Sequence, residues 1–238
     1  MTGPRTAMIL AAGFGTRMRP LTDACPKPLL RVAGRPMIDL VLDHAAAAGV
    51  RRAVVNLHYL GGMIRAHLAA RAVPEICFSD EQPVILETGG GIVQALPLLG
   101  AEPFYAVNSD AVWAGPNPLA CLAGAWDAAR MDALLLLVPR ARVRGYARAG
   151  DFFLEAEGAA PARRGTAAAA PLVYTGAQVI APGAFAGAPQ GPFSVNLVWD
   201  ALLAKGRLAA VTYPGTWVDV GTPAGLAEAE SALAEAGE

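Results

Sequence analysis

The residues best suited to chemistry lie in one stretch near the N-terminus, residues 7–30. An apolar run, expected to be a buried strand, leads there into Gly13 and Gly15. A strand that runs into a glycine-rich turn brings backbone N–H groups to one point, where they can surround a phosphate. The cations Arg17 and Lys27 follow, the first a planar fork of donors and the second a compact point charge. The stretch therefore predicts a site for a polyanion.

Two familiar nucleotide-binding motifs do not fit this stretch. The dinucleotide fingerprint requires a third glycine, and the chain has Met18 at that position. No Gly-Lys-Ser/Thr follows the glycines, so the stretch is not a P-loop. The missing glycine counts against a dinucleotide-binding oxidoreductase. For the two glycines taken alone, a turn that merely connects two elements stays open as the alternative.

Two aspartates are candidate metal ligands. Asp110 follows an apolar run over residues 104–108, and Asp219 lies in the segment 217–223, Trp-Val-Asp-Val-Gly-Thr-Pro. Carboxylates at strand ends hold metal ions in α/β enzymes, and carboxylate and phosphate oxygens suit Mg²⁺. Each has a structural alternative, Asp110 as a turn residue and Asp219 as a helix N-cap. No Ser-His-Asp or Cys-His arrangement is evident, and we interpret the histidines as structural or solvent-facing.

Strands and helices are expected to alternate along the chain. The expected strands are residues 7–12, 53–57, 75–78, 104–108, 133–138, 172–180 and 208–213, and the expected helices are 36–48, 61–70, 92–96, 118–130, 195–204 and 222–234. This alternation predicts an α/β protein with a mostly parallel sheet and crossover helices. Ligands of such sheets bind beyond the carboxyl ends of the strands, where the glycines and aspartates above fall.

Three further segments carry weaker signals. Gly89, Gly90 and Gly91 precede an expected helix and allow a flat or anionic group to approach the backbone, with a flexible hinge as the alternative. Residues 147–156 are expected to form strands around a Gly-Asp turn. Residues 158–170, rich in Ala, Arg, Gly and Pro, are expected to be an exposed loop whose two arginines are solvated.

Composition limits the class of protein. With 238 residues, 54% of them hydrophobic and 16% charged, the chain can form a substantial core and is not disordered. A formal net charge of −1 argues against a nucleic-acid partner and a membrane surface. The purest apolar run, residues 133–138, is far shorter than the roughly 18 residues of a membrane span, and no secretory signal is evident. The 3 cysteines have neither disulfide nor zinc spacing. We expect a cytoplasmic protein.

The combination Gly-x-Gly-Thr-Arg-x-x-Pro-Leu-Thr and Pro-Lys-Pro-Leu, at residues 13–22 and 26–29, resembles the signature of the sugar-1-phosphate nucleotidyltransferases. The resemblance extends over residues 7–230. It implies one domain over residues 1–238 with a Rossmann-like three-layer α/β/α fold, its nucleotide-binding half at about 7–110 and its sugar-binding half at about 111–238. It also implies a reaction in which a nucleoside triphosphate and a sugar 1-phosphate give a nucleotide sugar and pyrophosphate.

The resemblance also implies roles for individual residues. Arg17 would neutralise the leaving β- and γ-phosphates, and Lys27 would bind the α-phosphate and the incoming sugar phosphate. Asp110 and Asp219 would hold Mg²⁺. Residues implied in nucleotide binding are Leu10, Ala11, Ala12, Gly13, Gly15, Thr16, Glu81, Thr88 and Gly89, and those implied in sugar binding are Asn108, Glu155 and Thr175.

Within the family, the chain looks most like the bacterial enzymes of cell-wall sugar recycling that transfer a uridylyl group from UTP to N-acetylmuramate 1-phosphate. Guanylyltransferases for mannose 1-phosphate share the same frame and are the alternative, and a non-catalytic nucleotide-sugar sensor is a second. Ser109, where many relatives have glycine, and segments 80–86 and 158–170 depart from the pattern. We expect a monomer without an appended acyltransferase domain.

Overall fold

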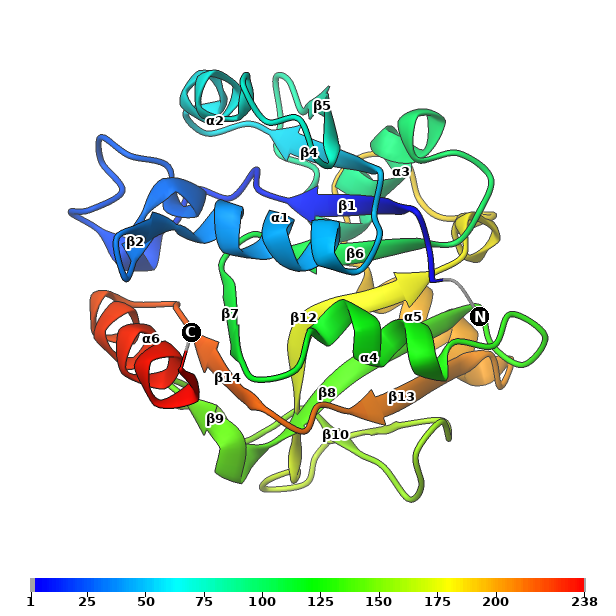
Figure 1. Cartoon of the computed structure of the whole chain (residues 1–238). Coiled ribbons are helices and arrows are strands. Elements are labelled where there is room, and N and C mark those ends of the chain that lie inside the picture. Colours follow the sequence, from blue (N-terminus) through cyan, green and yellow to red (C-terminus); the bar gives the residue numbers. More distant parts are fainter. Residues whose placement is uncertain (1–2, 238) are drawn as a thin grey trace.

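The computed structural model describes residues 3–237, and its centre is a 9-stranded sheet. This sheet contains β1 (Thr6–Leu10), β4 (Arg52–Leu57), β5 (Glu75–Asp80), β6 (Phe104–Asn108), β8 (Ala133–Pro139), β10 (Phe152–Phe153), β11 (Ala162–Arg163), β12 (Leu172–Ile180) and β13 (Leu208–Thr212). The order is β11-β10-β12-β6-β1-β4-β5, and β8 pairs with both β12 and β13. Figure 1 shows these strands crossing the middle of the molecule.

The long strands share one direction, with a single exception. β1 is parallel to β4 and β6, β4 is parallel to β5, and β13 is parallel to β8. β12 is antiparallel to both β6 and β8, so its first residues lie beside the carboxyl ends of those two strands. The predicted α/β fold with a mostly parallel sheet is confirmed, and one edge of the sheet collects the ends of its main strands.

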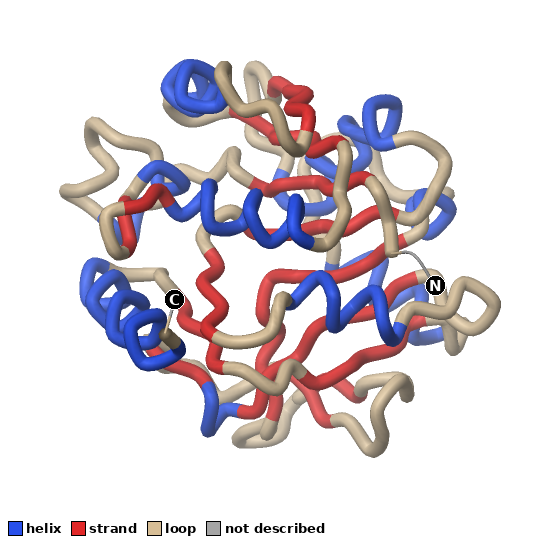
Figure 2. Tube along the Cα trace, viewed as in Figure 1, coloured by secondary structure: helices blue, strands red, loops and turns tan. Residues whose placement is uncertain are grey.

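Six helices accompany the sheets within residues 3–237. They are α1 (Met37–Ala47), α2 (Gly61–Leu68), α3 (Glu87–Leu99), α4 (Pro118–Ala125), α5 (Asn196–Ala204) and α6 (Pro223–Ala236), and none of them is long and apolar enough to span a membrane. Short 3₁₀ turns cover Thr16–Met18, Lys27–Leu29, Arg140–Arg142 and Pro182–Phe185. Figure 2 shows helices on both sides of the strands.

Side-chain alternation on the strands builds a core on each face of the sheet. Ala7 and Ile9 of β1 pack with α1, α2 and α4, whereas Met8, between them, packs with α3 and α5. Successive residues of a strand point to opposite faces, and burial of each large apolar side chain stabilises the fold by about 1.5–3 kcal/mol. The result is the helix–sheet–helix layering visible in Figure 1.

A second sheet, which the sequence patterns do not predict, forms a third core. It has 3 strands in the order β7-β14-β9, namely β7 (Ala111–Ala114), β9 (Val143–Arg144) and β14 (Thr216–Asp219). α6 covers this sheet, and the small hairpin of β2 (Arg31–Val32) and β3 (Arg35–Pro36) lies near it. The register places Asp219 opposite Ala111, directly after Asp110 in the chain. This pairing brings together two segments more than 100 residues apart.

Several predicted elements have different bounds. α3 begins at Glu87, so the three glycines lie inside the helix, and α4 ends at Ala125 rather than at residue 130. Residues 147–156 contain only the short β10, which pairs with β11 from the segment expected to be an open loop. Tertiary pairing decides such two-residue strands, because local propensity cannot stabilise them.

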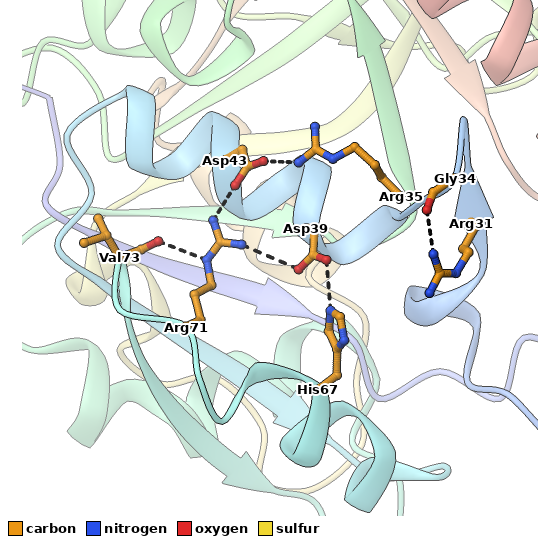
Figure 3. A network of polar contacts seen from close by, with 8 residues as sticks. All are labelled: Arg31, Gly34, Arg35, Asp39, Asp43, His67, Arg71 and Val73. Atoms are coloured by element: carbon orange, nitrogen blue, oxygen red, sulfur yellow. Dashed lines mark hydrogen bonds and ion pairs between the residues drawn. The ribbon is translucent and has the colours of Figure 1, made fainter.

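A network of charged side chains fastens α1 to its neighbours (Figure 3). Arg71 donates to Asp43 over 2.6 Å and lies 3.5 Å from Asp39, and the Nε2 atom of His67 lies 2.9 Å from Asp39. Partial burial favours the neutral form of Asp43, but hydrogen bonds from Arg71 and Arg35 outweigh it and lower the pKa of this carboxyl. The network thus holds α1 against α2 and β3, and His67 has a structural contact, as expected.

Candidate functional site

The glycine-rich turn after β1 is closed by its own side chains. Gly15 has a φ of +63°, and a Cβ atom there would lie 3.0 Å from Lys27 and 3.0 Å from Thr22. The Thr22 hydroxyl donates to the Gly15 carbonyl over 2.9 Å, and the Tyr59 hydroxyl donates to the Thr22 carbonyl over 2.8 Å. A left-handed backbone with no room for a side chain requires glycine. The turn is therefore a fixed, narrow loop.

Met18, the residue that breaks the dinucleotide fingerprint, anchors this loop. Its side chain is fully buried in the third core, together with Val112 of β7 and Val218 of β14. The neighbouring Arg17 remains exposed and lines the cavity in front of the loop. Met18 thus anchors the glycine-rich loop to the sheet that contains Asp219.

A cavity of about 210 Å³ lies at the carboxyl end of β1. It is lined by Leu10, Ala11, Gly13, Gly15, Thr16, Arg17, Met18, Lys27, Pro28, Ser109, Asp110 and Gly221. Most residues predicted to bind the nucleotide's phosphates therefore surround one space. Ala12 is buried beside them and does not line the cavity.

Lys27 and Asp110 form an ion pair across this cavity. The Lys27 side chain is only 11% exposed and that of Asp110 is 34% exposed. Ser109 donates its hydroxyl to the Leu10 carbonyl over 2.7 Å, which fixes the end of β6 against β1 and therefore the position of Asp110. The serine that departs from the family pattern is thus compatible with the predicted role of its neighbour.

Asp219 lies close to Arg17, and Gly221 makes the approach possible. A Cβ atom at Gly221 would lie 2.6 Å from a terminal nitrogen of Arg17 and 3.0 Å from a carboxylate oxygen of Asp219. Burial, and then the nearby charge of Asp110, raise the pKa of Asp219, while Arg17, Lys27 and Arg148 counteract part of the shift. Two carboxylates therefore face each other in a setting that favours an added cation.

The donor set fits Mg²⁺. Carboxylate oxygens are its preferred protein ligands, and Mg²⁺ commonly uses one or two of them together with phosphates and water. Within residues 3–237 no group of three His, Cys, Asp or Glu side chains is arranged to hold a metal. A metal held by Asp110 and Asp219 would thus require the substrate's phosphate oxygens or water as further ligands.

The raised pKa of Asp219 predicts that this carboxylate, kept for function, lowers the stability of the fold. A carboxyl whose pKa is raised by folding destabilises the fold at every pH above that pKa, where it is ionised. Without Mg²⁺ we expect Asp219→Asn to raise the melting temperature at pH 7. The gain should shrink as the pH falls through the raised pKa and vanish below the ordinary value of about 4.

Thermal unfolding in EDTA at pH 7 and pH 4 measures this effect. Asp80→Asn is a matched control, because Asp80 is an exposed aspartate that ends β5 and pairs with Arg65 over 2.7 Å. Its loss should leave the melting temperature unchanged or slightly lower. A lower melting temperature for Asp219→Asn at pH 7 would contradict the assignment of net unfavourable charge to this site.

A second cavity of about 330 Å³ adjoins the first and shares Leu10, Arg17 and Asp110 with it. Its other lining residues are Thr88, Asn108, Ala111, Arg148, Asp151, Phe152, Arg163, Tyr174, Gly176, Gln178, Ser194, Val195, Asn196, Trp199, Trp217 and Asp219. Polar side chains and aromatic rings mix here, as in pockets for small polar ligands. Thr88 and Asn108 are the predicted nucleotide- and sugar-binding residues placed here.

Asn108 owes its position to Gly176. Gly176 has a φ of +80°, and a Cβ atom there would lie 2.8 Å from the side-chain nitrogen of Asn108. The group that closely approaches this glycine is the side-chain amide of Asn108, the last residue of β6. Any larger residue would push Asn108 out of place.

The structure places three of the residues predicted to contact substrates outside both cavities. Thr175 is fully buried and donates its hydroxyl to the Leu136 carbonyl over 2.9 Å, so its side chain does not reach the second cavity. Glu155 is exposed and lines neither cavity. Glu81, expected to bind the nucleotide, is fully buried and lines neither cavity. Strand direction and loop path, which the sequence does not reveal, place these side chains.

Glu81 instead supports the loop from within. Its carboxylate accepts hydrogen bonds from the Asn56 amide over 2.6 Å and from the Leu86 backbone N–H over 2.7 Å. The Asn56 carbonyl oxygen accepts in turn from the Ala11 backbone N–H over 2.6 Å. A chain of buried hydrogen bonds thus connects segment 81–86 with the end of β1.

The three glycines of α3 serve packing rather than ligand binding. A Cβ atom at Gly89 would lie 2.3 Å from Phe193, one at Gly90 would lie 2.3 Å from the Gly191 carbonyl, and one at Gly91 would lie 2.4 Å from Glu81. All three are buried, so the close approach predicted from them is made by the protein itself. Gly89, predicted to bind the nucleotide, lines neither cavity.

No sequence motif reveals the arginines and aromatic residues of the second cavity. Arg163, interpreted as solvated charge, donates to Asp200 over 2.7 Å and lies 5.6 Å from the Trp199 ring centroid. Arg148 and Trp199 belong to no sequence motif, because the second cavity is assembled from loops and helices that are separate in the chain. Arg163 in a low-complexity segment could have been noticed only through its tertiary partners.

Comparisons with known proteins identify the family of this chain. Residues 6–150 match the family model described as "Nucleotidyl transferase". The chain is 45% identical over 239 residues to N-acetylmuramate alpha-1-phosphate uridylyltransferase from Caulobacter vibrioides, covering 98% of each chain. It is 37% identical to the protein of the same name from Neisseria meningitidis, covering 94% of this chain and 96% of that one.

Among solved structures, the inositol-1-phosphate CTP transferase from T. maritima superposes with a TM-score of 0.78 at 18% identity, covering 100% of this chain and 98% of that one. At that identity the likeness speaks for the fold alone. The family model and the two relatives reach further, since they cover most or nearly all of the sequence. The chain belongs to the nucleotidyl transferase family.

Proposed function

We propose that this protein transfers the uridylyl group of UTP to N-acetylmuramate α-1-phosphate, giving the UDP-sugar and pyrophosphate. The observation that carries the proposal is the convergence of Arg17, Lys27, Asp110 and Asp219 on adjoining cavities at the carboxyl edge of the sheet. The two relatives that span nearly the whole chain carry the name of this activity.

The chemistry needs no covalent nucleophile. A phosphate oxygen of the sugar phosphate attacks the α-phosphorus of the nucleotide, and the bond from that phosphorus to the oxygen bridging the β-phosphorus breaks. Pyrophosphate leaves with the electron pair. Bound Mg²⁺ would neutralise phosphate charge and align the two substrates. The residues of this chain contribute mainly position and electrostatic stabilisation.

Each part of the first cavity has a role in this scheme. The backbone of Gly13 and Gly15 surrounds the triphosphate, and Arg17 stabilises charge on the departing β- and γ-phosphates. Lys27, held in place by Asp110, attracts the α-phosphate and the incoming sugar phosphate. Asn108, in the second cavity, orients the sugar.

The proposal extends to the setting of the protein. We place it in the cytoplasm as a monomer in cell-wall sugar recycling, with the nucleotide in the half formed by about residues 7–110 and the sugar in the half formed by about residues 111–238. It requires no nucleic acid and no membrane. A non-catalytic sensor is the alternative, and such a protein would not need both cations and both carboxylates.

Pyrophosphate release in the presence of Mg²⁺ tests the proposal, measured for each of four nucleoside triphosphates with a set of sugar 1-phosphates. Strong release only with UTP and N-acetylmuramate 1-phosphate is the expected result. Release with GTP and mannose 1-phosphate would replace the substrates while keeping the chemistry. No release from a folded protein that still binds UDP-sugar would favour the sensor.

A further inference from the structure

Arg148 occupies a distinctive position in the second cavity. It lies in the loop between β9 and β10 and lines the cavity together with Asp151 and Trp217. Its guanidinium carbon lies 5.1 Å from the ring centroid of Tyr146. Burial raises the pKa of Asp219, and the positive charge of Arg148 counteracts part of that rise. Arg148 therefore faces the space between the reacting end and the sugar end.

Arg148 is also uncommitted. Among the residues that the structure describes, 3–237, it makes no ion pair. Arg163, the other arginine of the sugar end, is bound through its Nε atom to Asp200 over 2.7 Å and donates to the Asn196 carbonyl over 3.1 Å. Arg163 thus joins β11 to α5, while Arg148 has donors available for a ligand.

The two cavities already contain partners for the phosphates and the hydroxyl groups of a sugar 1-phosphate whose sugar is uncharged. Arg17 and Lys27 serve the phosphates in the first cavity, and Asn108 and Gln178 offer amides for hydroxyl groups. Asp151 is engaged as well, since it accepts from the Tyr174 backbone N–H over 3.0 Å. A further guanidinium on this side has no partner in a sugar whose only charge is its phosphate.

An acidic sugar would supply that partner. N-acetylmuramate differs from N-acetylglucosamine by a lactyl ether whose carboxylate is ionised at neutral pH. The cavity contains the carboxylates of Asp110, Asp151 and Asp219, so a further carboxylate on the substrate would be repelled without a compensating cation. A guanidinium binds a carboxylate through two parallel hydrogen bonds.

We propose that Arg148 forms a carboxylate subsite and makes the enzyme selective for sugar 1-phosphates with an acidic substituent, a proposal that rests on the proposed function. The Tyr146 ring packs against the guanidinium and limits its orientation. Arg148 acts in substrate selection, whereas the transfer itself depends on the residues of the first cavity.

The test compares two substrates that differ in one charge, N-acetylmuramate 1-phosphate and its lactyl methyl ester. Both carry the same phosphate and nearly the same volume. The unaltered enzyme should have a kcat/KM at least about tenfold higher for the acid, as expected for a hydrogen-bonded ionic contact at a partly exposed site. Arg148→Ala should lose this preference by a fall in the value for the acid, and Arg148→Lys should keep part of it.

Arg52→Ala is the matched control, because Arg52 is an exposed arginine at the opposite edge of the sheet, 3.6 Å from Glu75. It should leave both values unchanged. An Arg148→Ala enzyme that loses equally on acid and ester would place Arg148 at the shared phosphate and overturn the subsite, as would one that keeps full selectivity. Failure of the unaltered enzyme to use the acid at all would instead overturn the proposed function.

Discussion

Replacing Asp110 with alanine is expected to lower kcat for pyrophosphate release by at least about 100-fold, the range seen when a group that stabilises the charged transition state is removed. Asp110 is one of the two carboxylates available to Mg²⁺, and it is the ion-pair partner of Lys27. Its loss removes a metal ligand and frees a nearly buried lysine to move away from the α-phosphate. The Mg²⁺ concentration for half-maximal rate should rise as well.

The controls separate chemistry from folding. Asp110→Asn keeps the shape of the side chain and should still lose most activity, because it loses the negative charge. Asp80→Asn changes an aspartate at the end of β5, another strand of the same sheet, outside both cavities, and should behave like the unaltered enzyme. Rates are compared at equal folded fraction, determined by circular dichroism. More than a tenth of normal activity in Asp110→Ala would remove this residue from the metal site.

Arg17→Ala is the second substitution for which we expect a loss of about 100- to 1,000-fold in kcat/KM for UTP. Arg17 lines both cavities and approaches Asp219 over the bare backbone of Gly221. Its guanidinium is the only arginine donor that both cavities share within the described residues 3–237, so no neighbour replaces it against the leaving pyrophosphate.

Arg19→Ala provides the comparison. Arg19 stands two residues away in the same loop, pairs with Asp23 over 3.3 Å and lines neither cavity. It should retain nearly full activity. Arg17→Lys should recover only part of the rate, because an ammonium cannot form the paired hydrogen bonds of a guanidinium. Equal activity of Arg17→Ala and Arg19→Ala would show that Arg17 has no specific part in catalysis.

Sequence patterns were sufficient for the main strands and most helices. The apolar runs of β1, β6 and β8 and the helical spacing of α1 are strong local signals that packing reinforces. The short strands β7 and β14 were not predicted, since each is held by a partner distant in the chain. The start of α3 was misplaced because its three glycines have poor helix propensity and tertiary packing overrides it.

The same distinction runs through the candidate site. Gly15, Arg17 and Lys27 could be identified from the sequence because the turn that presents them is local, closed by Thr22 within a few residues. Glu81 and Thr175 were assigned to ligands although both are buried, because sequence position does not say which way a side chain points. Their corrected roles, in supporting a loop and joining two strands, depend on Asn56 and Leu136.

The class of chemistry can be inferred from the chain alone, since few functions fit a polyanion loop with two cations and two strand-end aspartates. Which groups meet depends on the fold: β7 pairs with β14 to bring Asp219 beside Asp110, and Gly221 lets Arg17 approach them. It likewise placed Arg148 at the second cavity. The physical reason is that local signals report backbone conformation within a few residues, whereas convergence of charges depends on packing between segments far apart in the chain.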